Sequence, residues 1–281
     1  MPEGDTVWRQ ARDLRAVLEG QMLASSDFRV PAFATLDLSG KTVSAVESRG
    51  KHLLMHAGGH VIHSHLSMEG HWDIYPLAAG GRAGRWRRPA FTARVVLQTE
   101  FVSAVGFSLG LLEVVPAAHL EDVVGHLGPD LLGPDWDAGE ALRRLLLAPG
   151  RAVGLALLDQ RNLAGIGNVY RNDLCFLGGV HPATPIGEVA ALPRMVDLSK
   201  RLLEANKDRS KRSTTGGPAR GEAAAWVYGL AGKPCKRCGS LIRYGTLADP
   251  LYPTQAARDI YWCPRCQPQD PTGQNPSGQG L

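Results

Sequence analysis

The stretch Cys235-Lys-Arg-Cys238, followed after 24 residues by Cys263-Pro-Arg-Cys266, contains two C-x2-C pairs. Two residues between cysteines allow one tight turn to present both sulfurs to a tetrahedral ion at about 2.3 Å. Two such turns on neighbouring hairpin ends fill all four positions of a zinc ion. The spacing therefore predicts a structural zinc that helps a segment too small for its own core to fold. A disulfide pair or four unrelated thiols are the less favoured alternatives.

The remaining cysteine and the start of the chain give little sign of export. Cys175 lies between Leu174 and Phe176 in an expected helix, which favours a buried structural thiol. The opening residues show no basic start followed by an apolar stretch, as a secretory signal would. No apolar run approaches the roughly 18–20 residues that span a bilayer. We expect a cytoplasmic protein without a membrane segment, in which paired cysteines stay reduced and bind metal.

Charge is distributed unevenly along the 281 residues. The formal net charge is +4, and the composition excludes a collagen, a coiled coil, a mostly disordered chain and a small disulfide scaffold. Residues 200–266 hold 13 basic and five acidic side chains, a local charge of +8 that leaves −4 for the rest. A basic segment that also carries a zinc site favours a polyanion partner, most simply nucleic acid. The alternative is a solvated charged face.

Hydrophobic periodicity predicts one helix followed by many short strands. Apolar residues from Val7 to Leu18 recur at helical spacing and indicate a helix over about 4–19. The β-prone stretches, separated by Gly or Pro clusters, favour a sandwich or a barrel. They are 22–28, 42–46, 52–56, 61–65, 93–98 and 111–115. Residues 79–89, with Arg82, Arg85, Arg87 and Arg88, are expected to form an exposed basic loop.

After Pro116 the pattern becomes helical. Helices are expected at 137–147, 153–158, 169–176 and 192–206, with Gly165-Ile-Gly-Asn168 as a tight turn. Short strands are expected around the cysteines. The Gln/Pro/Gly/Ser-rich end of the chain is predicted to be disordered.

Four separated motifs agree in order and rough spacing with one known family. They are Pro2-Glu3-Gly4, Gly50-Lys51-His52, the run from Gln160 to Tyr170 with Gly165-Ile-Gly-Asn168 at its centre, and Arg258 ahead of Cys263-Pro-Arg-Cys266. The chain resembles the formamidopyrimidine-DNA glycosylase/endonuclease VIII family of base-excision repair enzymes over about residues 2–267. The opening Pro-Glu-Gly is similar to the endonuclease VIII branch of actinobacterial type.

The resemblance implies an α+β multidomain fold with DNA in a cleft. The expected parts are an N-terminal helix plus β-sandwich domain, a linker, a helix–two-turn–helix domain, a C-terminal zinc finger and a disordered tail. Their expected bounds are 1–116, 117–136, 137–232, 233–267 and 268–281.

The resemblance also assigns catalytic roles. It implies that Pro2, exposed by removal of Met1, attacks C1′ of an oxidised nucleotide, expels the base and forms an imine. An α-amino group titrates near pH 7.7–8.0, well below a lysine, so it is a ready nucleophile. Glu3 is expected to transfer a proton to or from the opening sugar. Lys51 and Arg258 are expected to assist the β- and δ-eliminations that cut the strand.

Three residues are expected to bind DNA. A glycosylase must flip its target base and refill the vacated stack. Met68, in His65-Leu-Ser-Met68, resembles the family's intercalating methionine, while Asn168 and Arg258 are expected to contact phosphates. Thr6 stands where the family often has a second Glu. The Arg-Phe-Gly that helps to fill the void in the formamidopyrimidine branch is absent from residues 101–110. Both departures favour oxidised pyrimidines over 8-oxoguanine.

Other interpretations remain at the level of sequence. A non-catalytic zinc-finger protein could bind abasic or damaged DNA. A hydrolytic metalloenzyme could use the histidines between 52 and 71, although no carboxylate lies at a convincing spacing from His63 and His65. We expect one zinc, no organic cofactor and a monomer that meets damaged DNA in the nucleoid.

Overall fold

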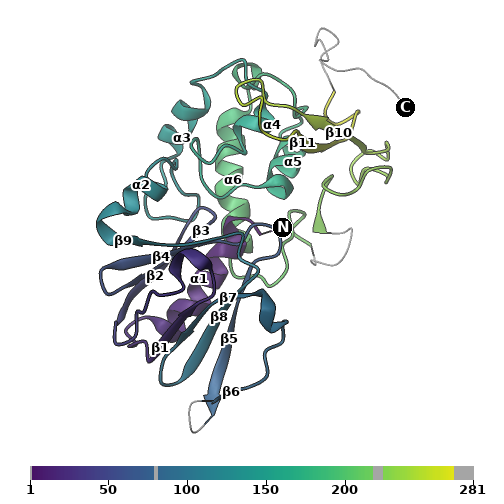
Figure 1. The fold of residues 1–281 in the computed structure, drawn as a ribbon. Helices are drawn as coiled ribbons and strands as arrows, with labels where there is room; N and C mark the ends of the chain where they lie inside the picture. Colours follow the sequence, from purple (N-terminus) through teal and green to yellow (C-terminus); the bar gives the residue numbers. More distant parts are fainter. Residues whose placement is uncertain (1, 79–81, 218–223, 269–281) are drawn as a thin grey trace. The chain divides into compact units, whose positions relative to one another are not determined.

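Helix α1 (Gly4–Leu18) is the first element of the computed structural model, which describes residues 2–78, 82–217 and 224–268. The chain divides into two units, Met1–Pro134 and Asp135–Leu281. The first combines α1 with β-strands, and the second combines helices with a two-stranded ribbon (Figure 1).

Helix α1 forms because its apolar residues lie on one face. Val7, Ala11, Leu14 and Leu18 are each at most 1% exposed, and their spacing matches the 3.6-residue turn. Burying a valine or leucine side chain contributes about 1.5–3 kcal/mol. Gly20 follows with φ of 79°, a conformation open to glycine and unfavourable for another helical residue. The helix predicted over 4–19 is confirmed.

The strands of the first unit form two antiparallel sheets, in the orders β1-β7-β8-β5-β6 and β2-β3-β4-β9. The five-stranded sheet contains β1 (Ser25–Phe28), β5 (His71–Ala78), β6 (Arg82–Ala83), β7 (Ala93–Gln98) and β8 (Val102–Phe107). The four-stranded sheet contains β2 (Val43–Arg49), β3 (His52–Ala57), β4 (His60–His65) and β9 (Leu111–Pro116). Short helices η1 (Pro31–Phe33), η2 (Ala90–Thr92), η3 (Ala117–His119) and α2 (Leu120–Val124) lie between or after them.

Both sheets and α1 contribute to one hydrophobic core. Leu14 of α1, Met55 and Ile62 of the four-stranded sheet and Leu97 of the five-stranded sheet belong to the same buried cluster. Figure 1 shows the two sheets facing each other, with α1 (purple) alongside. Because the sheets are separate, the architecture is a sandwich rather than a barrel.

Each predicted β-prone stretch contains all or most of a strand, but the sequence pattern missed β5, β8 and the short β6, which lies in the stretch 79–89 expected to be a loop. Strands β5 and β8 pair with each other from His71↔Phe107 to Pro76↔Val102, inside the five-stranded sheet. Pro76 cannot donate a ladder hydrogen bond, and Gly106 has no side chain to raise β-propensity, so both stretches resemble loops in isolation. Burial of Trp72, Val105 and their neighbours compensates in the folded chain.

The second unit begins with helices. Their bounds are α3 (Ala138–Leu145), α4 (Val153–Ala156), α5 (Asn168–Leu177), η4 (Ile186–Glu188) and α6 (Leu192–Asn206). Helix α6 packs against α3 and α5, and the buried side chains include Leu174, Met195 and Leu203. All four predicted helices are present. Asn168, expected on the preceding turn, is instead the first residue of α5.

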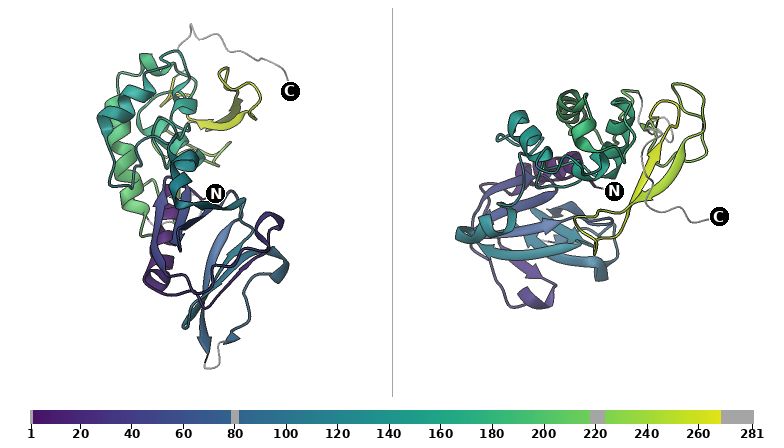
Figure 2. Two further views of the ribbon diagram at one scale, coloured as in Figure 1. Left: turned by 60° about the vertical axis from the view of Figure 1, so that its left-hand side comes forward. Right: turned by 90° about the horizontal axis from the view of Figure 1, so that it is seen from above.

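The ribbon β10 (Arg243–Leu247) and β11 (Arg258–Trp262) pairs antiparallel beside α5. Figure 2 shows it in yellow at the edge of the helices in both views. Phe176 of α5, Val227 and Ile242 pack with Cys235 and Cys263 in one apolar cluster. The ribbon therefore packs against α5 and against the apolar cluster that contains the cysteines.

The predicted linker, 117–136, contains η3 and α2, and the division between the two units falls within it at Pro134. The finer division into five parts stays a prediction, and residues 269–281 of the expected tail lie outside the described residues. Among the described helices, none combines the length and the apolar character needed to cross a bilayer.

Candidate active site and metal centre

Pro2 and Glu3 lie immediately before α1. Glu3 caps the helix, and its carbonyl accepts hydrogen bonds from Thr6 N–H at 2.9 Å and Val7 N–H at 3.1 Å. Its side chain is fully buried, whereas Pro2 is half-buried. Asp5 is a second buried carboxylate here, and its Oδ1 accepts from Thr6 N–H at 2.8 Å. The start of α1 thus presents a partly accessible proline beside buried acids.

Lys51 lies in the turn between β2 and β3, next to Gly50. Gly50 has φ of 57°, and its N–H donates to Asp130 Oδ2 at 2.9 Å. Asp130 is 3% exposed and also accepts from Leu132 N–H at 3.0 Å. A left-handed glycine and a buried carboxylate therefore fix the turn that carries Lys51.

A hydrogen-bonded chain begins at the residue after Lys51. His52 Nδ1 lies 2.7 Å from His63 Nε2, and His63 Nδ1 lies 2.7 Å from Glu113 Oε1. Glu113 accepts from Nδ1–H of His63, and the second hydrogen bond joins His63 Nε2 to His52 Nδ1. The chain crosses β3, β4 and β9. Burial, and after it the nearby His63 and His65, lower the pKa of His52 to about 3.

Glu113 is the carboxylate partner that sequence spacing did not reveal. It pairs with His63 across β4 and β9, although the two residues are 50 positions apart. The expectation that no carboxylate lies at a convincing sequence spacing still holds, because strand pairing rather than spacing brings Glu113 to His63. Within the described residues, the histidines do not join any group of three or more metal-ligating side chains that converge, and the four cysteines do.

Met68 lies on a tight turn after β4, with its side chain 64% exposed. Gly70 N–H donates to Leu66 O at 2.8 Å, and Ser67 has φ of 55°. A Cβ on Gly70 would approach Leu66 O to 2.3 Å, so the turn requires glycine. The turn therefore presents an apolar, unbranched side chain to solvent.

In the second unit, Asn168 and the start of β11 are tied together. Fully buried Arg171 donates from Nη2 to Asn168 Oδ1 at 3.0 Å and to Asp259 O at 2.5 Å. Asn172 Oδ1 accepts from Tyr261 N–H at 2.8 Å. Arg258, the first residue of β11, is exposed and precedes Asp259 directly. The structure thus brings the predicted residues Asn168 and Arg258 to neighbouring elements, which sequence separation alone did not show.

Asp173 on α5 organises the segment that precedes the ribbon. This fully buried carboxylate accepts from the Thr214 hydroxyl, from Trp226 N–H at 3.0 Å and from Val227 N–H at 3.0 Å. Burial raises its pKa against these hydrogen bonds. The neighbouring thiol of Cys175 is buried too, and burial raises its pKa to about 12, as expected for an inert structural cysteine.

The four paired cysteines converge. Their sulfurs all lie within 4.8 Å of one another, with Cys235 Sγ 4.0 Å from Cys266 Sγ and Cys238 Sγ 3.4 Å from Cys263 Sγ. A tetrahedral ion with metal–sulfur bonds of about 2.3 Å separates its sulfurs by about 3.8 Å. The four cysteines therefore fit a closed metal site.

Comparisons with known proteins agree over nearly the whole chain. Residues 1–107 match the formamidopyrimidine-DNA glycosylase N-terminal domain. Probable endonuclease 8 2 from Streptomyces coelicolor is 52% identical over 95% of this chain and 94% of its own length. The DNA-(apurinic or apyrimidinic site) lyase Nei2 of Mycolicibacterium smegmatis is 46% identical over 95% of this chain and 99% of its own. The chain belongs to the formamidopyrimidine-DNA glycosylase/endonuclease VIII family.

Further comparisons define the branch and the fold. Endonuclease 8 2 of Mycobacterium tuberculosis is 46% identical over 95% of this chain and all of its own, which supports the endonuclease VIII branch. A Lactococcus lactis formamidopyrimidine-DNA glycosylase, solved with DNA containing an AP site, matches with a TM-score of 0.75 and 23% identity, covering 95% of this chain and all of that one. The α+β fold predicted for this family member is confirmed, including its sandwich, its helix–two-turn–helix domain and a finger bearing four cysteines.

Proposed function

We propose that the protein is a bifunctional DNA glycosylase/AP lyase of base-excision repair that removes oxidised bases, with oxidised pyrimidines favoured. The observation that carries this proposal is the half-buried Pro2 beside the buried carboxyl of Glu3, in a chain 46% identical to a named AP-site lyase. A secondary amine and a proton-transfer group at one place are what imine chemistry at a sugar carbon needs.

The first step joins the Pro2 nitrogen to C1′ of the flipped nucleotide. The base leaves with the electron pair of its glycosidic bond, and O4′ takes a proton as the sugar ring opens. Glu3 is the proposed proton donor. Its carboxyl is fully buried beside the half-buried Pro2.

The iminium ion then makes the C2′ proton acidic. Loss of that proton expels the 3′-phosphate, and a second elimination expels the 5′-phosphate. Lys51, on its fixed turn, and Arg258, at the start of β11, are proposed to hold and neutralise these phosphates. Each carries a cation that stabilises a departing phosphate.

Met68 and Asn168 are proposed to bind the DNA itself. The exposed Met68 side chain is a suitable wedge for the stack that the flipped nucleotide leaves. Asn168, at the N-terminus of α5, is proposed to contact a phosphate there.

The metal is proposed to be one structural zinc ion held by Cys235, Cys238, Cys263 and Cys266. When bound, it would stabilise the finger and thereby position Arg258. The proposal needs no organic cofactor. It places a monomer on damaged nucleoid DNA in the cytoplasm, which native mass measurement and localisation of a tagged chain would test.

Borohydride trapping tests the chemistry. Protein whose intact mass confirms a free Pro2 is incubated with abasic-site DNA and borohydride, and a stable covalent adduct that maps to Pro2 is expected. Pro2→Gly should weaken or reroute the adduct and leave DNA affinity largely intact. No adduct from the free-Pro2 protein, with abasic DNA still bound, would leave a non-catalytic damage-binding protein instead. Oxidised-pyrimidine and 8-oxoguanine duplexes in the same assay would give the base preference.

A further inference from the structure

A basic surface lies at one end of the five-stranded sheet, on residues to which the proposed function gives no role. It consists of Arg9 on α1, His71 at the start of β5, and Arg87 and Arg88 on the segment before η2; we call it the β5 basic cluster. The three arginines lie near the His71 ring. Burial lowers the pKa of His71, Asp73 opposes that change, and the arginine charges add to the lowering.

One buried carboxylate organises this cluster. Asp73, with a side chain 9% exposed, lies 3.2 Å from His71 Nε2 through Oδ1. Its Oδ2 accepts from Arg88 Nε at 3.1 Å and from the Tyr75 hydroxyl at 3.1 Å. Tyr75 in turn accepts from Arg87 N–H at 3.1 Å. The backbone at Arg87 and the side chain of Arg88 are thus both fixed to β5.

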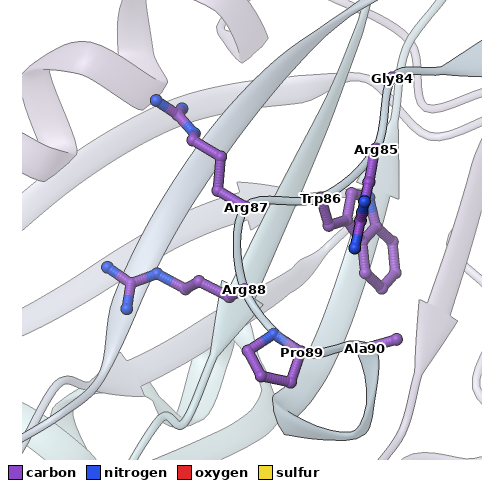
Figure 3. A pocket seen from close by; sticks show the side chains of 7 residues that line it. All are labelled: Gly84, Arg85, Trp86, Arg87, Arg88, Pro89 and Ala90. Atoms are coloured by element: carbon purple, nitrogen blue, oxygen red, sulfur yellow. The ribbon is translucent and has the colours of Figure 1, made fainter.

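A second set of contacts holds the segment from behind. Trp86 packs edge-on against Phe107 with ring centroids 5.5 Å apart, and the Arg29 guanidinium lies 5.2 Å from the Trp86 centroid. Figure 3 shows the Arg87 and Arg88 side chains extending to the same side of the segment, away from Trp86. Residues 84–90 line a hollow of about 760 Å³.

The anchored arginines keep positive charge available to a ligand. The Arg88 side chain is 41% exposed, and within the described residues its hydrogen bond to Asp73 uses Nε. Arg87 is exposed, with its guanidinium 5.5 Å from the Tyr75 centroid. Three arginines lie near His71 and the single carboxylate of Asp73, so cations outnumber anions among these residues. Side chains held in place before binding lose less entropy when they bind.

The cluster is joined closely to the Met68 turn. His71 follows Met68 by three residues, and its Nδ1 accepts from Gln10 Nε2 at 2.6 Å. Gln10 Oε1 accepts from Trp72 N–H at 3.0 Å. The turn that carries the proposed wedge therefore leads directly into β5, the strand that carries the carboxylate that fixes Arg88.

We propose that Arg87 and Arg88 bind backbone phosphates of the DNA duplex next to the nucleotides that Met68 separates. The inference rests on the proposed function. A guanidinium fork matches a phosphodiester, and contacts of this kind fix register and orientation rather than read sequence. Arg87 and Arg88, which belong to the basic stretch predicted from the sequence, would thereby position the DNA, a role separate from catalysis.

Salt dependence of DNA affinity tests this inference. We compare the full chain with Arg87→Gln/Arg88→Gln on a duplex containing a reduced abasic-site analogue, from about 50 to 200 mM salt. Each lost phosphate contact lowers the slope of log K against log salt by about 0.9, so the double variant should lose about 1.8. Arg12→Gln is the matched control: Arg12 is 39% exposed and pairs with Asp13 on α1. It should keep the wild-type slope.

Two further variants separate charge from folding. Arg87→Lys/Arg88→Lys keeps both charges and should recover most of the slope. Arg87→Gln alone leaves the Arg88–Asp73 contact in place and should lose about 0.9. An unchanged slope in the double variant, or a loss that lysine does not recover, would overturn the inference. Borohydride trapping by the wild-type chain reports separately on the proposed function, because it needs Pro2 and not these arginines.

Discussion

The burial of Glu3 is the residue-scale feature with the clearest chemical consequence. Its carboxyl is inaccessible to bulk water while Pro2 beside it is partly open. A proton donor is most valuable in the step that opens the sugar ring, and less so once an aldehyde is already present. Glu3 should therefore affect base removal more than reaction at a preformed abasic site.

Glu3→Gln is expected to slow base release about 10²–10⁴-fold, the usual contribution of a positioned acid or base. Imine trapping on preformed abasic DNA should fall much less. Single-turnover kinetics measure the rate of base release, and borohydride trapping on a matched abasic duplex measures imine formation. Asp13→Asn, a half-exposed acid on the same helix, is the control and should change neither. Equal loss of both activities would instead indicate that Glu3 stabilises the start of α1.

At the scale of elements, the hydrogen-bonded side chains of His52, His63 and Glu113 join strands β3, β4 and β9, and His52 directly follows Lys51. His52 keeps a neutral ring because burial holds its pKa near 3, against an ordinary 6.5. Between these values the unfolded chain binds a proton that the folded chain does not. The contribution of His52 to the free energy of unfolding is thus complete above pH 6.5. It falls as the pH drops from 6.5 toward 3, by up to about 1.4 kcal/mol per pH unit.

His52→Gln should therefore flatten the loss of stability below pH 6.5. Urea unfolding of wild type and variant over a pH series measures the two slopes. His119→Gln serves as the control, because His119 is 66% exposed and pairs with Asp122 three residues away. Parallel wild-type and His52→Gln curves would show that His52 does not stay neutral through burial.

The ribbon is expected to depend on the four cysteines that converge beside it, whereas Cys175 of α5 lies outside that cluster. Cys238→Ser should remove one of four metal ligands, abolish tight zinc binding and weaken DNA affinity, because β11 carries Arg258. Metal analysis and equilibrium DNA binding measure these effects. Cys175→Ala is the matched control: that thiol is buried in α5, outside the four-sulfur cluster, and the variant should keep one zinc per chain. DNA affinity unchanged in Cys238→Ser would mean that the ribbon is peripheral to binding.

For the whole molecule, the two units carry different parts of the proposed activity. The nucleophile, its acid and the wedge belong to residues 1–134, and the metal centre with Arg258 belongs to residues 135–281. The net charge of +4 conceals this division, since residues 200–266 alone amount to +8. The β5 basic cluster shows that the first unit, although less basic, also concentrates positive charge locally.

Local spacing determined a large part of this protein from sequence. The two C-x2-C pairs, the periodicity of α1 and the four helices of the second unit were predictable, because residues three or four apart meet through backbone geometry alone. The motifs also identified the family. Strands β5 and β8 were not predictable, because Pro76 and Gly106 weaken their local preference and partner strands supply the stability.

Only the tertiary structure decided which distant side chains meet. His63 and Glu113 are 50 positions apart, Arg88 and Asp73 are 15 apart, and Arg171 reaches a carbonyl 88 residues away. No local pattern encodes these contacts, since they depend on strand order and on the path of the chain between them. The sequence by itself determined the chemical groups and the local turns that present them. The fold decided which of those groups are buried, paired and held in place, because burial and pairing belong to the packed chain rather than to any segment of it.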